Sequence, residues 1–342
     1  MGFEYVRRIP SVEEILAEIP MPENLKNIKK IRDKEIRDVI TGISDKFLLI
    51  IGPCSAHDEE AVCDYVSRLG KIQDKVKDKI VLIPRIYTNK PRTTGEGYKG
   101  MAHQPKIKEA PNMVEGLKTI RKMHIRALKE SYLFSADEML YPENYPYLED
   151  MLSYVAIGAR SVENQKHRLT VSGLDIPVGM KNPTSGDLDV MLNSIKAGQI
   201  GHLFSYNGWE VKTPGNPLVH SVLRGAMNKH GQSIPNYHYE DMMLITELYL
   251  KRSLENPAVI VDTNHANSGK LYKEQIRIAY EVLRSREYSP LLKKMVKGLM
   301  VESFIEEGSQ KAEENIYGKS ITDPCISWVD TQSLILGIAD KL

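Results

Sequence analysis

The sequence predicts an α/β protein folded as a (β/α)8 TIM barrel, with an N-terminal helical extension and an inserted hairpin near the sixth strand. The chain has 342 residues, which suits one barrel of roughly 250 residues plus additions. Apolar, strand-like runs alternate with longer amphipathic stretches, as in a parallel sheet covered by helices. Apolar residues make up 42% of the chain, enough to bury a sizeable core.

The first 45 residues are charged and polar and carry two helical patterns. In the first, SVEEILAEI, Ser11 is followed three residues later by Glu14, which is the spacing of a capping box. Residues 25–43 repeat apolar side chains at helical spacing. We expect residues 1–45 to form an oligomerisation or regulatory arm and residues 46–342 to form the catalytic barrel domain.

Strand-like runs follow this extension in a regular series. They are 47–52, 80–87, 131–138, 154–160, 177–182, 202–206, 220–226, 258–266 and 298–303. Helical patterns between them include 59–74, 112–130, 187–198, 239–255 and 270–287. Nine runs exceed the eight strands of a barrel. Because the gap between 202–206 and 220–226 is short and rich in Gly, Asn and Pro, we interpret that pair as one repeat that carries a hairpin.

Composition excludes several classes of function. The net charge is +1, so the molecule has no overall basic character for binding nucleic acid or an anionic membrane. No apolar run approaches the roughly 20 residues of a membrane span, and the N-terminus lacks the apolar core of a signal peptide. The three cysteines, Cys54, Cys63 and Cys325, do not make a disulfide framework, which favours a reducing cytoplasm.

Charged and metal-binding side chains follow the predicted strands. In barrels of this type, residues just past the carboxyl end of each strand line the active site. Those positions here are Cys54, Arg85, Glu138, Arg160, Lys181, Arg224, His265 and Glu302. Eight such residues together indicate an active site rather than a series of unrelated surface ion pairs.

Basic residues dominate this set and predict an anion site. The predicted cations are Arg85, Lys90, Arg92, Arg160, Lys181 and Arg224. Arginine matches phosphate or carboxylate with two parallel hydrogen bonds, whereas lysine acts as a compact charge. Six converging cations suit more than one anionic group. The loop NKPRTTGEGYKG (89–100) adds hydroxyl donors and glycines that let backbone amides approach a phosphate.

Four further residues are potential metal ligands. Cys54, His265, Glu302 and Asp323 each follow a strand or a short turn. One sulfur, one imidazole and two carboxylates form a mixed donor set that suits Mn, Fe, Co or Zn without selecting among them.

Motifs in fixed order resemble those of the class I 3-deoxy-D-arabino-heptulosonate-7-phosphate (DAHP) synthases, from about residue 45 to 332. They are IGPCSAHD, PRIYTNKPRTTGEGYKG, AIGARSVENQKHR, PVGMKN, VLRGA, DTNHAN, MVES and YGKSITDPCISW. The resemblance implies a metal-dependent, cytoplasmic transferase that condenses phosphoenolpyruvate with D-erythrose 4-phosphate in the shikimate pathway, releasing phosphate.

The resemblance also implies a role for each candidate. It assigns the metal to Cys54, His265, Glu302 and Asp323. It assigns phosphoenolpyruvate to Arg85, Lys90, Arg160, Lys181 and Arg224, with Glu138 beside them, and the sugar phosphate to Arg92 and Thr93. We expect catalysis to use Lys90, Arg160, Lys181 and Glu138. Lys90 is the candidate for proton transfer, because neighbouring cations would lower its pKa.

Two other functions fit parts of the same pattern. An octulosonate-phosphate synthase would use arabinose 5-phosphate, although the KPRTT loop favours the four-carbon sugar. A non-catalytic barrel could bind phosphorylated metabolites, although every candidate metal ligand is retained. By family analogy we expect a homo-oligomer, dimer or tetramer. Unusual residues occupy the regions that form the feedback pocket of regulated relatives: Tyr145, Pro146, Thr170, Asp175 and Tyr206. Two alternatives therefore stay open, an unregulated enzyme or one that senses a different ligand.

Overall fold

Eight parallel strands surround a common interior in the computed structural model, which describes residues 2–342. They are β1 (Phe47–Gly52), β2 (Ile80–Pro84), β3 (Ser135–Glu138), β4 (Leu152–Ile157), β5 (Val178–Lys181), β8 (Val219–Leu223), β11 (Val259–Asp262) and β12 (Val296–Glu302). Their order is β2-β1-β12-β11-β8-β5-β4-β3. A single bridge, between Arg85 and Ala136, joins the two end strands. The predicted (β/α)8 barrel is confirmed.

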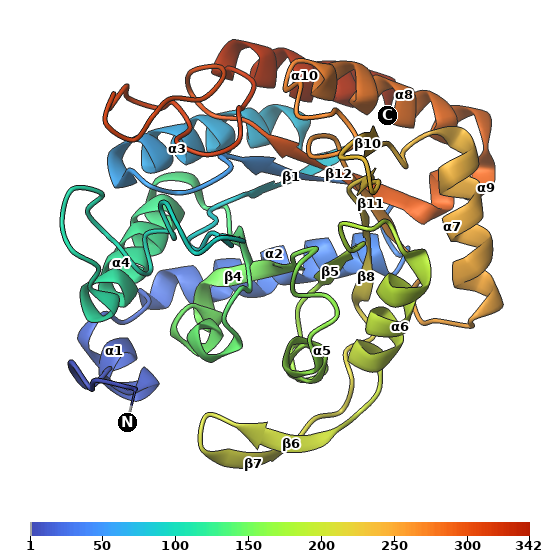
Figure 1. The fold of residues 1–342 in the computed structure, drawn as a ribbon. Coiled ribbons are helices and arrows are strands. Elements are labelled where there is room, and N and C mark those ends of the chain that lie inside the picture. The colour runs from blue at the N-terminus through green and yellow to red at the C-terminus, as the bar shows by residue number, and fades with distance from the viewer. Residues whose placement is uncertain (1) are drawn as a thin grey trace.

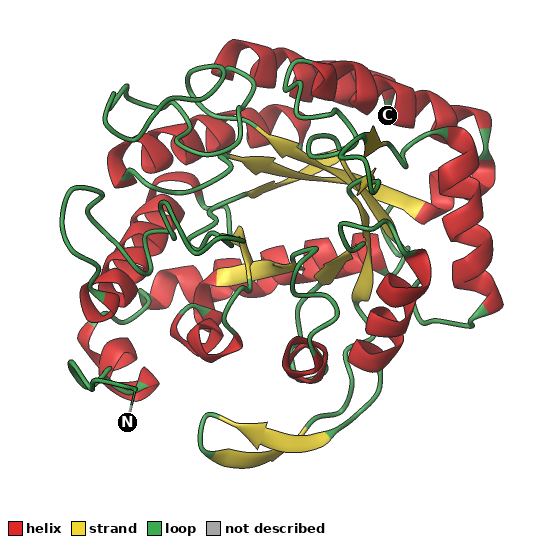
Figure 2. Cartoon of the chain, viewed as in Figure 1, coloured by secondary structure: helices red, strands yellow, loops and turns green. Residues whose placement is uncertain are grey.

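Helices cover the outside of the barrel (Figures 1 and 2). They are α3 (Glu59–Val76), α4 (Met113–Ser131), α5 (Gln165–Val171), α6 (Leu188–Gln199), α7 (Tyr239–Lys251), α8 (Glu274–Tyr288), α9 (Pro290–Met295) and α10 (Trp328–Lys341). Short polar side chains begin several of them. Asp58, Asn112 and Asp187 each accept a hydrogen bond from a backbone amide of the first turn, which satisfies an amide that has no partner within the helix.

The N-terminal extension closes one end of the barrel. Ser11 and Glu14 form the predicted capping box at the start of α1 (Val12–Glu18). In α2 (Glu23–Ile40), the side chains of Ile36, Val39 and Ile40 join the hydrophobic cluster that fills the barrel interior. Figure 1 shows α2 lying across the barrel. That residues 1–45 act as an oligomerisation or regulatory arm stays a prediction.

The segment 202–206 forms a hairpin strand outside the barrel, as predicted. Strand β6 (Leu203–Tyr206) pairs antiparallel with β7 (Trp209–Lys212) ahead of β8, the sixth strand of the barrel. The hydroxyl of Tyr206 donates to the carbonyl of Pro142, 2.9 Å away, and so ties the hairpin to the 3-10 helix η1 (Pro142–Tyr147).

Two smaller elements complete the fold. A second 3-10 helix, η2 (Glu149–Met151), precedes β4. Past the carboxyl end of β8, β9 (Ala226–Met227) and β10 (Ser233–Ile234) form a short hairpin.

Within residues 2–342, no helix has the length and apolar character that crossing a membrane requires.

Candidate active site

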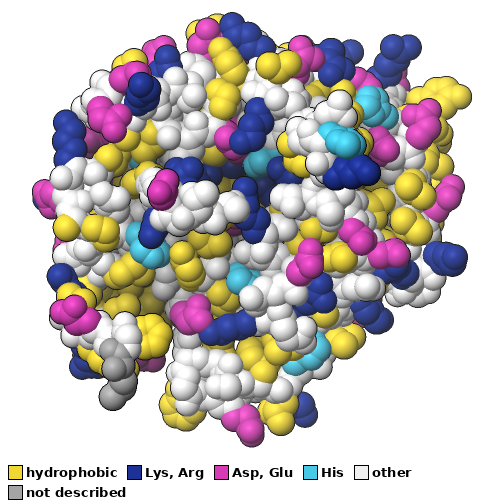
Figure 3. Space-filling model, in the orientation of Figure 1, with side chains coloured by type: hydrophobic (Ala, Val, Ile, Leu, Met, Phe, Trp, Pro, Cys, Tyr) yellow, Lys and Arg dark blue, Asp and Glu magenta, His cyan; other side chains and the backbone are white. Residues whose placement is uncertain are grey.

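A cavity of about 750 Å³ opens at the carboxyl ends of the barrel strands. Nine of the predicted site residues line it: Cys54, Lys90, Arg92, Glu138, Arg160, Lys181, Arg224, His265 and Asp323. Figure 3 shows Lys and Arg side chains gathered around the hollow in the middle of this face. Residues spread over 270 positions of sequence therefore meet in one place, as expected from the shared carboxyl edge of a parallel sheet.

Three of the four predicted metal ligands lie close together. Potential ligand atoms of Cys54, Glu302 and Asp323 all lie within 4.8 Å of one another. The strand register explains the first pair: Gly52 of β1 is paired with Glu302 of β12, so Cys54 follows beside it. Asp323 lies in the loop after β12 and accepts a 2.9 Å hydrogen bond from Lys270 Nζ. A thiol and two carboxylates suit a divalent transition metal.

His265 lies on the cavity wall but is not part of that close group. Its Nδ1 is 2.9 Å from Oδ2 of the buried Asp262, which leaves Nε2 as the nitrogen available to a ligand. Metal-binding histidines commonly direct their second nitrogen at a carboxylate in this way. His265 also has a left-handed backbone, with φ of +49°. The local geometry thus fits the predicted ligand role.

Asp262 joins the metal half of the site to the basic half. Its Oδ2 lies 3.2 Å from Nζ of Lys181, and both side chains are almost completely buried. Burial alone would raise the pKa of Asp262, but the charges of His265 and Lys181 hold it well below its usual range. Asp262 did not stand out as a candidate in the sequence. Its position as the last residue of a strand, three residues before His265, was the available signal.

Glu302 and Arg85 form a buried ion pair behind the cavity wall. Arg85 Nη2 donates to Glu302 Oε1 at 3.0 Å, and Asn264 donates to Oε2 at 2.5 Å. Burial raises the pKa of Glu302, but Arg85 and His265 outweigh it, so the carboxyl stays ionised. The remaining Arg85 donors, Nε and Nη1, have no hydrogen-bond partner among residues 2–342, and neither has Nη1 of Arg224. Buried donors of this kind are rare without a ligand, so they favour an anion site.

Lys90 approaches the metal group directly, with its Nζ 3.0 Å from Sγ of Cys54. Burial raises the pKa of the Cys54 thiol, and Glu302 raises it further. The expectation that neighbouring cations lower the pKa of Lys90 is wrong. Burial does lower it, but the Cys54 sulfur and the Glu302 carboxylate outweigh both burial and Arg85, so the pKa is raised. Lys90 is therefore an ammonium ion at neutral pH.

Arg92 and Thr93 differ in their placement. Arg92 lines the cavity, and its Nε donates to the carbonyl of Tyr98 at 2.8 Å, which folds the loop back on itself. Thr93 is exposed and is not on the cavity wall. The assignment of Thr93 to the sugar phosphate stays a prediction.

Two kinds of comparison relate this chain to known proteins. Residues 21–335 match the family model described as the DAHP synthetase I family. The Phe-sensitive phospho-2-dehydro-3-deoxyheptonate aldolase of Escherichia coli strain K12 is 36% identical over 350 residues, covering 98% of this chain and 96% of the relative. The Tyr-sensitive enzyme of the same strain is 36% identical over 341 residues, covering 96% and 92%.

A solved structure extends the likeness to the fold. The phospho-2-dehydro-3-deoxyheptonate aldolase of Francisella tularensis SCHU S4 superimposes with a TM-score of 0.91 at 28% identity, covering 100% of this chain and 98% of that one. The chain therefore belongs to the DAHP synthetase I family, transferases that form DAHP in the biosynthesis of aromatic amino acids.

Proposed function

We propose that this chain condenses phosphoenolpyruvate with D-erythrose 4-phosphate to give DAHP and inorganic phosphate, using one bound divalent metal ion. One observation carries the proposal: a thiol and two carboxylates lie within 4.8 Å of one another at the edge of a cavity whose wall is rich in lysine and arginine. A metal-binding group beside an anion site suits a reaction between an aldehyde and a phosphorylated enol.

Phosphoenolpyruvate would bind to the inner cations. Its phosphate and carboxylate need several charge-assisted donors. Lys90, Arg160, Lys181 and Arg224 line one space, and Arg85 lies directly behind its wall. The unpartnered donors of Arg85 and Arg224 support this assignment, because a bound anion would satisfy them.

Erythrose 4-phosphate would place its phosphate nearer the cavity mouth. Arg92 is the cation at that position, and its Nε is already held by Tyr98. The guanidinium is thereby fixed in orientation, with its Nη groups left for a phosphate. Thr93 would need to turn toward the cavity to contribute its hydroxyl.

The metal would be held by Cys54, His265, Glu302 and Asp323, and Mn, Fe, Co and Zn all suit this donor set. Bound there, the ion supplies Lewis-acid polarisation of the sugar aldehyde. Lys90 keeps a positive charge beside the Cys54 sulfur and so limits repulsion between that thiolate and the two carboxylates. Lys270 acts in the same way on Asp323.

In the reaction, carbon 3 of phosphoenolpyruvate forms a bond to the aldehyde carbon of the sugar. Water adds to carbon 2 and leaves a hydroxyl there. The bond from carbon 2 to the phosphate oxygen then breaks as this hydroxyl becomes the ketone, and its proton leaves with the phosphate. Lys90 would protonate the alkoxide that forms from the aldehyde. Glu138, at the end of the neighbouring strand β3, would accept a proton from the attacking water. Arg160 and Lys181 would stabilise the departing phosphate and the developing charge.

A steady-state assay with two aldoses tests the proposal. We expect phosphate release from phosphoenolpyruvate to depend on erythrose 4-phosphate and to be far slower with arabinose 5-phosphate. Faster turnover with arabinose 5-phosphate would assign the chain to octulosonate-phosphate synthesis. Binding of phosphoenolpyruvate without turnover with either aldose would identify a non-catalytic binding protein and refute the proposal.

A further inference from the structure

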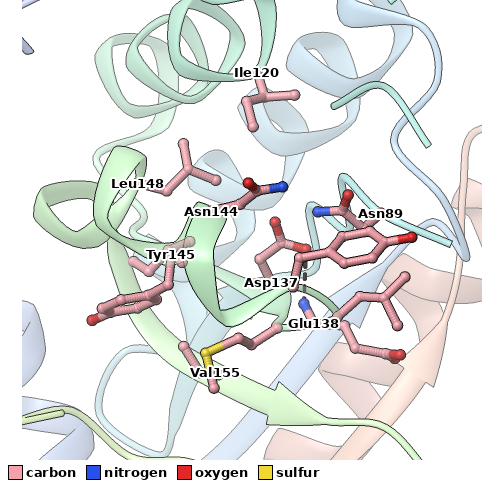
Figure 4. A pocket seen from close by; sticks show the side chains of 12 residues that line it. Asn89, Ile120, Asp137, Glu138, Asn144, Tyr145, Leu148 and Val155 are labelled. Carbon is pink, nitrogen blue, oxygen red and sulfur yellow. Dashed lines mark hydrogen bonds between the residues drawn. The ribbon is translucent and has the colours of Figure 1, made fainter. Parts of the chain in front are cut away.

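A second, much smaller cavity lies beside the active site and shares Glu138 with it. Its volume is about 20 Å³, which is room for roughly one water molecule. Figure 4 shows the side chains of Asn89, Asp137 and Asn144 directed at the space between them, with Ile120 and Leu148 closing the apolar side. Nothing in the proposed reaction uses Asn89 or Asp137, although they precede Lys90 and Glu138 in the chain.

Asp137 is a buried carboxylate that hydrogen bonds alone hold in place. It is 4% exposed. Its Oδ1 accepts from the backbone amides of Thr88 (3.0 Å) and Glu138 (2.7 Å), and its Oδ2 accepts from the Thr88 hydroxyl at 2.5 Å. The Thr88 hydroxyl in turn accepts from Asn89 Nδ2 at 3.3 Å. The Oδ1 of Asn89 is buried and has no partner among residues 2–342.

These bonds lie where the barrel is most weakly closed. Strands β2 and β3 are joined by one bridge, at Arg85 and Ala136, and by the 2.9 Å hydrogen bond from Ile86 N to Ala136 O. Beyond that point the two strands separate, and the Asp137 carboxylate takes over as the acceptor for Thr88 N. A side chain therefore continues the connection that the backbone ladder no longer makes.

Thr88 is also the base of the loop that carries two active-site cations. Its carbonyl accepts from Ala102 N at 3.1 Å, so both ends of the segment 88–102 meet at this residue. Within the loop, Lys90 N donates to the carbonyl of Lys99 at 3.0 Å. Whatever fixes Thr88 therefore fixes the start of the segment from which Lys90 reaches Cys54.

We propose that Asp137 is a positioning residue: by holding Thr88 through two hydrogen bonds, its carboxylate sets the loop 88–102 and so places Lys90 against Cys54 and Arg92 at the cavity wall. The proposal rests on the proposed function only for what those cations do in the reaction. The placement of the loop itself is independent of the substrates.

The charge of Asp137 depends on pH in the working range. Burial raises the pKa of its carboxyl to about 7, although the hydrogen bonds from Thr88 and Glu138 lower it and the charge of Glu138 raises it. The other titratable side chains on the small cavity are Tyr141 and Tyr145. Because the hydrogen bonds from Thr88 lower this pKa, release of Thr88 from a carboxylate that stays buried would raise it further. The ionised form therefore holds Thr88 more tightly than the protonated form, and the loop should be held more firmly at pH 8 than at pH 6.

Hydrogen exchange of the full-length protein, followed by mass spectrometry, tests this directly. We compare wild type, Asp137→Asn and Thr88→Val with Thr246→Val, which removes a buried hydroxyl bond (2.8 Å, to Met242 O) in α7. Asparagine has the shape of protonated Asp137, so that variant should resemble wild type at low pH. Loss of a hydrogen bond to a charged group predicts about 10–100-fold faster exchange in peptides spanning 88–102, with Thr88→Val intermediate.

The pH series and the kinetics complete the test. In wild type, exchange of residues 88–102 should slow between pH 6 and pH 8 after correction for intrinsic exchange, whereas Asp137→Asn should show no such change. Among variants of equal thermal stability, turnover with phosphoenolpyruvate should fall in Asp137→Asn and Thr88→Val but not in Thr246→Val. Exchange of 88–102 that is the same in Asp137→Asn and Thr246→Val would overturn the proposal. A wild-type enzyme without activity would refute the proposed function and leave the exchange result standing.

Discussion

The buried pair of Asp262 and Lys181 gives the most quantitative prediction. The two charges are 3.2 Å apart, with side-chain exposures of 0% and 3%. At an effective dielectric constant of about 20, this distance corresponds to roughly 5 kcal/mol of attraction. Asp262→Asn keeps the size of the side chain and keeps an acceptor for the amide of Asn264, but it leaves Lys181 as a buried cation without its counterion. We expect the free energy of unfolding to fall by about 3–5 kcal/mol.

The same substitution should weaken metal binding. Asp262 is the acceptor that faces Nδ1 of His265, and loss of such a partner typically costs about 10–100-fold in metal affinity. Chemical denaturation measures the first effect, and titration of the metal-free protein with Mn2+ or Co2+ measures the second.

A matched control separates this pair from surface charge. Glu109→Gln removes an exposed partner of Lys106 (63% and 69% exposed) and should change the unfolding free energy by less than about 1 kcal/mol. If Asp262→Asn is as mild as this control, or if its metal affinity equals that of wild type, the role given to Asp262 is wrong.

Three further changes test other parts of the structure. Cys54→Ala should preserve the fold and lower metal affinity by more than about 100-fold, measured by metal titration and circular dichroism; unchanged affinity would remove Cys54 from the ligand set. Burial lowers the pKa of His220 to about 4. Its neutral form therefore gives stability that is complete above pH 6.5 and is lost as the pH falls toward 4. His220→Gln should reduce the acid-induced loss of unfolding free energy by about 3 kcal/mol at pH 4, whereas parallel curves of unfolding free energy against pH for the two proteins would contradict this. Gly100→Ala should lower the free energy of unfolding by about 1–3 kcal/mol, because φ is +104° and the new Cβ would lie 2.3 Å from Thr88 O. Gly95→Ala, which has open space around it, should lower it less. Equal losses of unfolding free energy in chemical denaturation would show that the contact at Gly100 is relieved.

The barrel could be predicted from sequence because its strands are buried on both faces and therefore read as continuous apolar runs. Strand β7 did not stand out, since it is largely exposed and lacks such a run. The start of β3 was placed too early, at 131 rather than Ser135. Tyr132 ends α4 in a left-handed conformation, and the apolar residues after it pack as a connection rather than as a strand.

The cavity walls were predictable for a related reason: the carboxyl ends of parallel strands share one edge, so charged residues at those ends must converge. The sequence could not reveal which charges offset one another. Asp262 and Asp137 are each an aspartate at or near a strand end, yet one bridges Lys181 and His265 whereas the other is held by Thr88. The raised pKa of Lys90 likewise depends on its distance from Cys54, which spacing along the chain does not encode.

We propose that a metal held at Cys54, Glu302, Asp323 and His265 enables the neighbouring cations to condense two phosphorylated substrates. Product formation can be measured with protein that is stripped of metal by a chelator and then restored with Mn2+, Fe2+, Co2+ or Zn2+, with the seven-carbon product detected by mass spectrometry. We predict no product from the stripped protein, and one DAHP per phosphate released after restoration with at least one of these ions. Full activity of the stripped protein, or phosphate release without the seven-carbon product, would show that this metal site does not support the condensation.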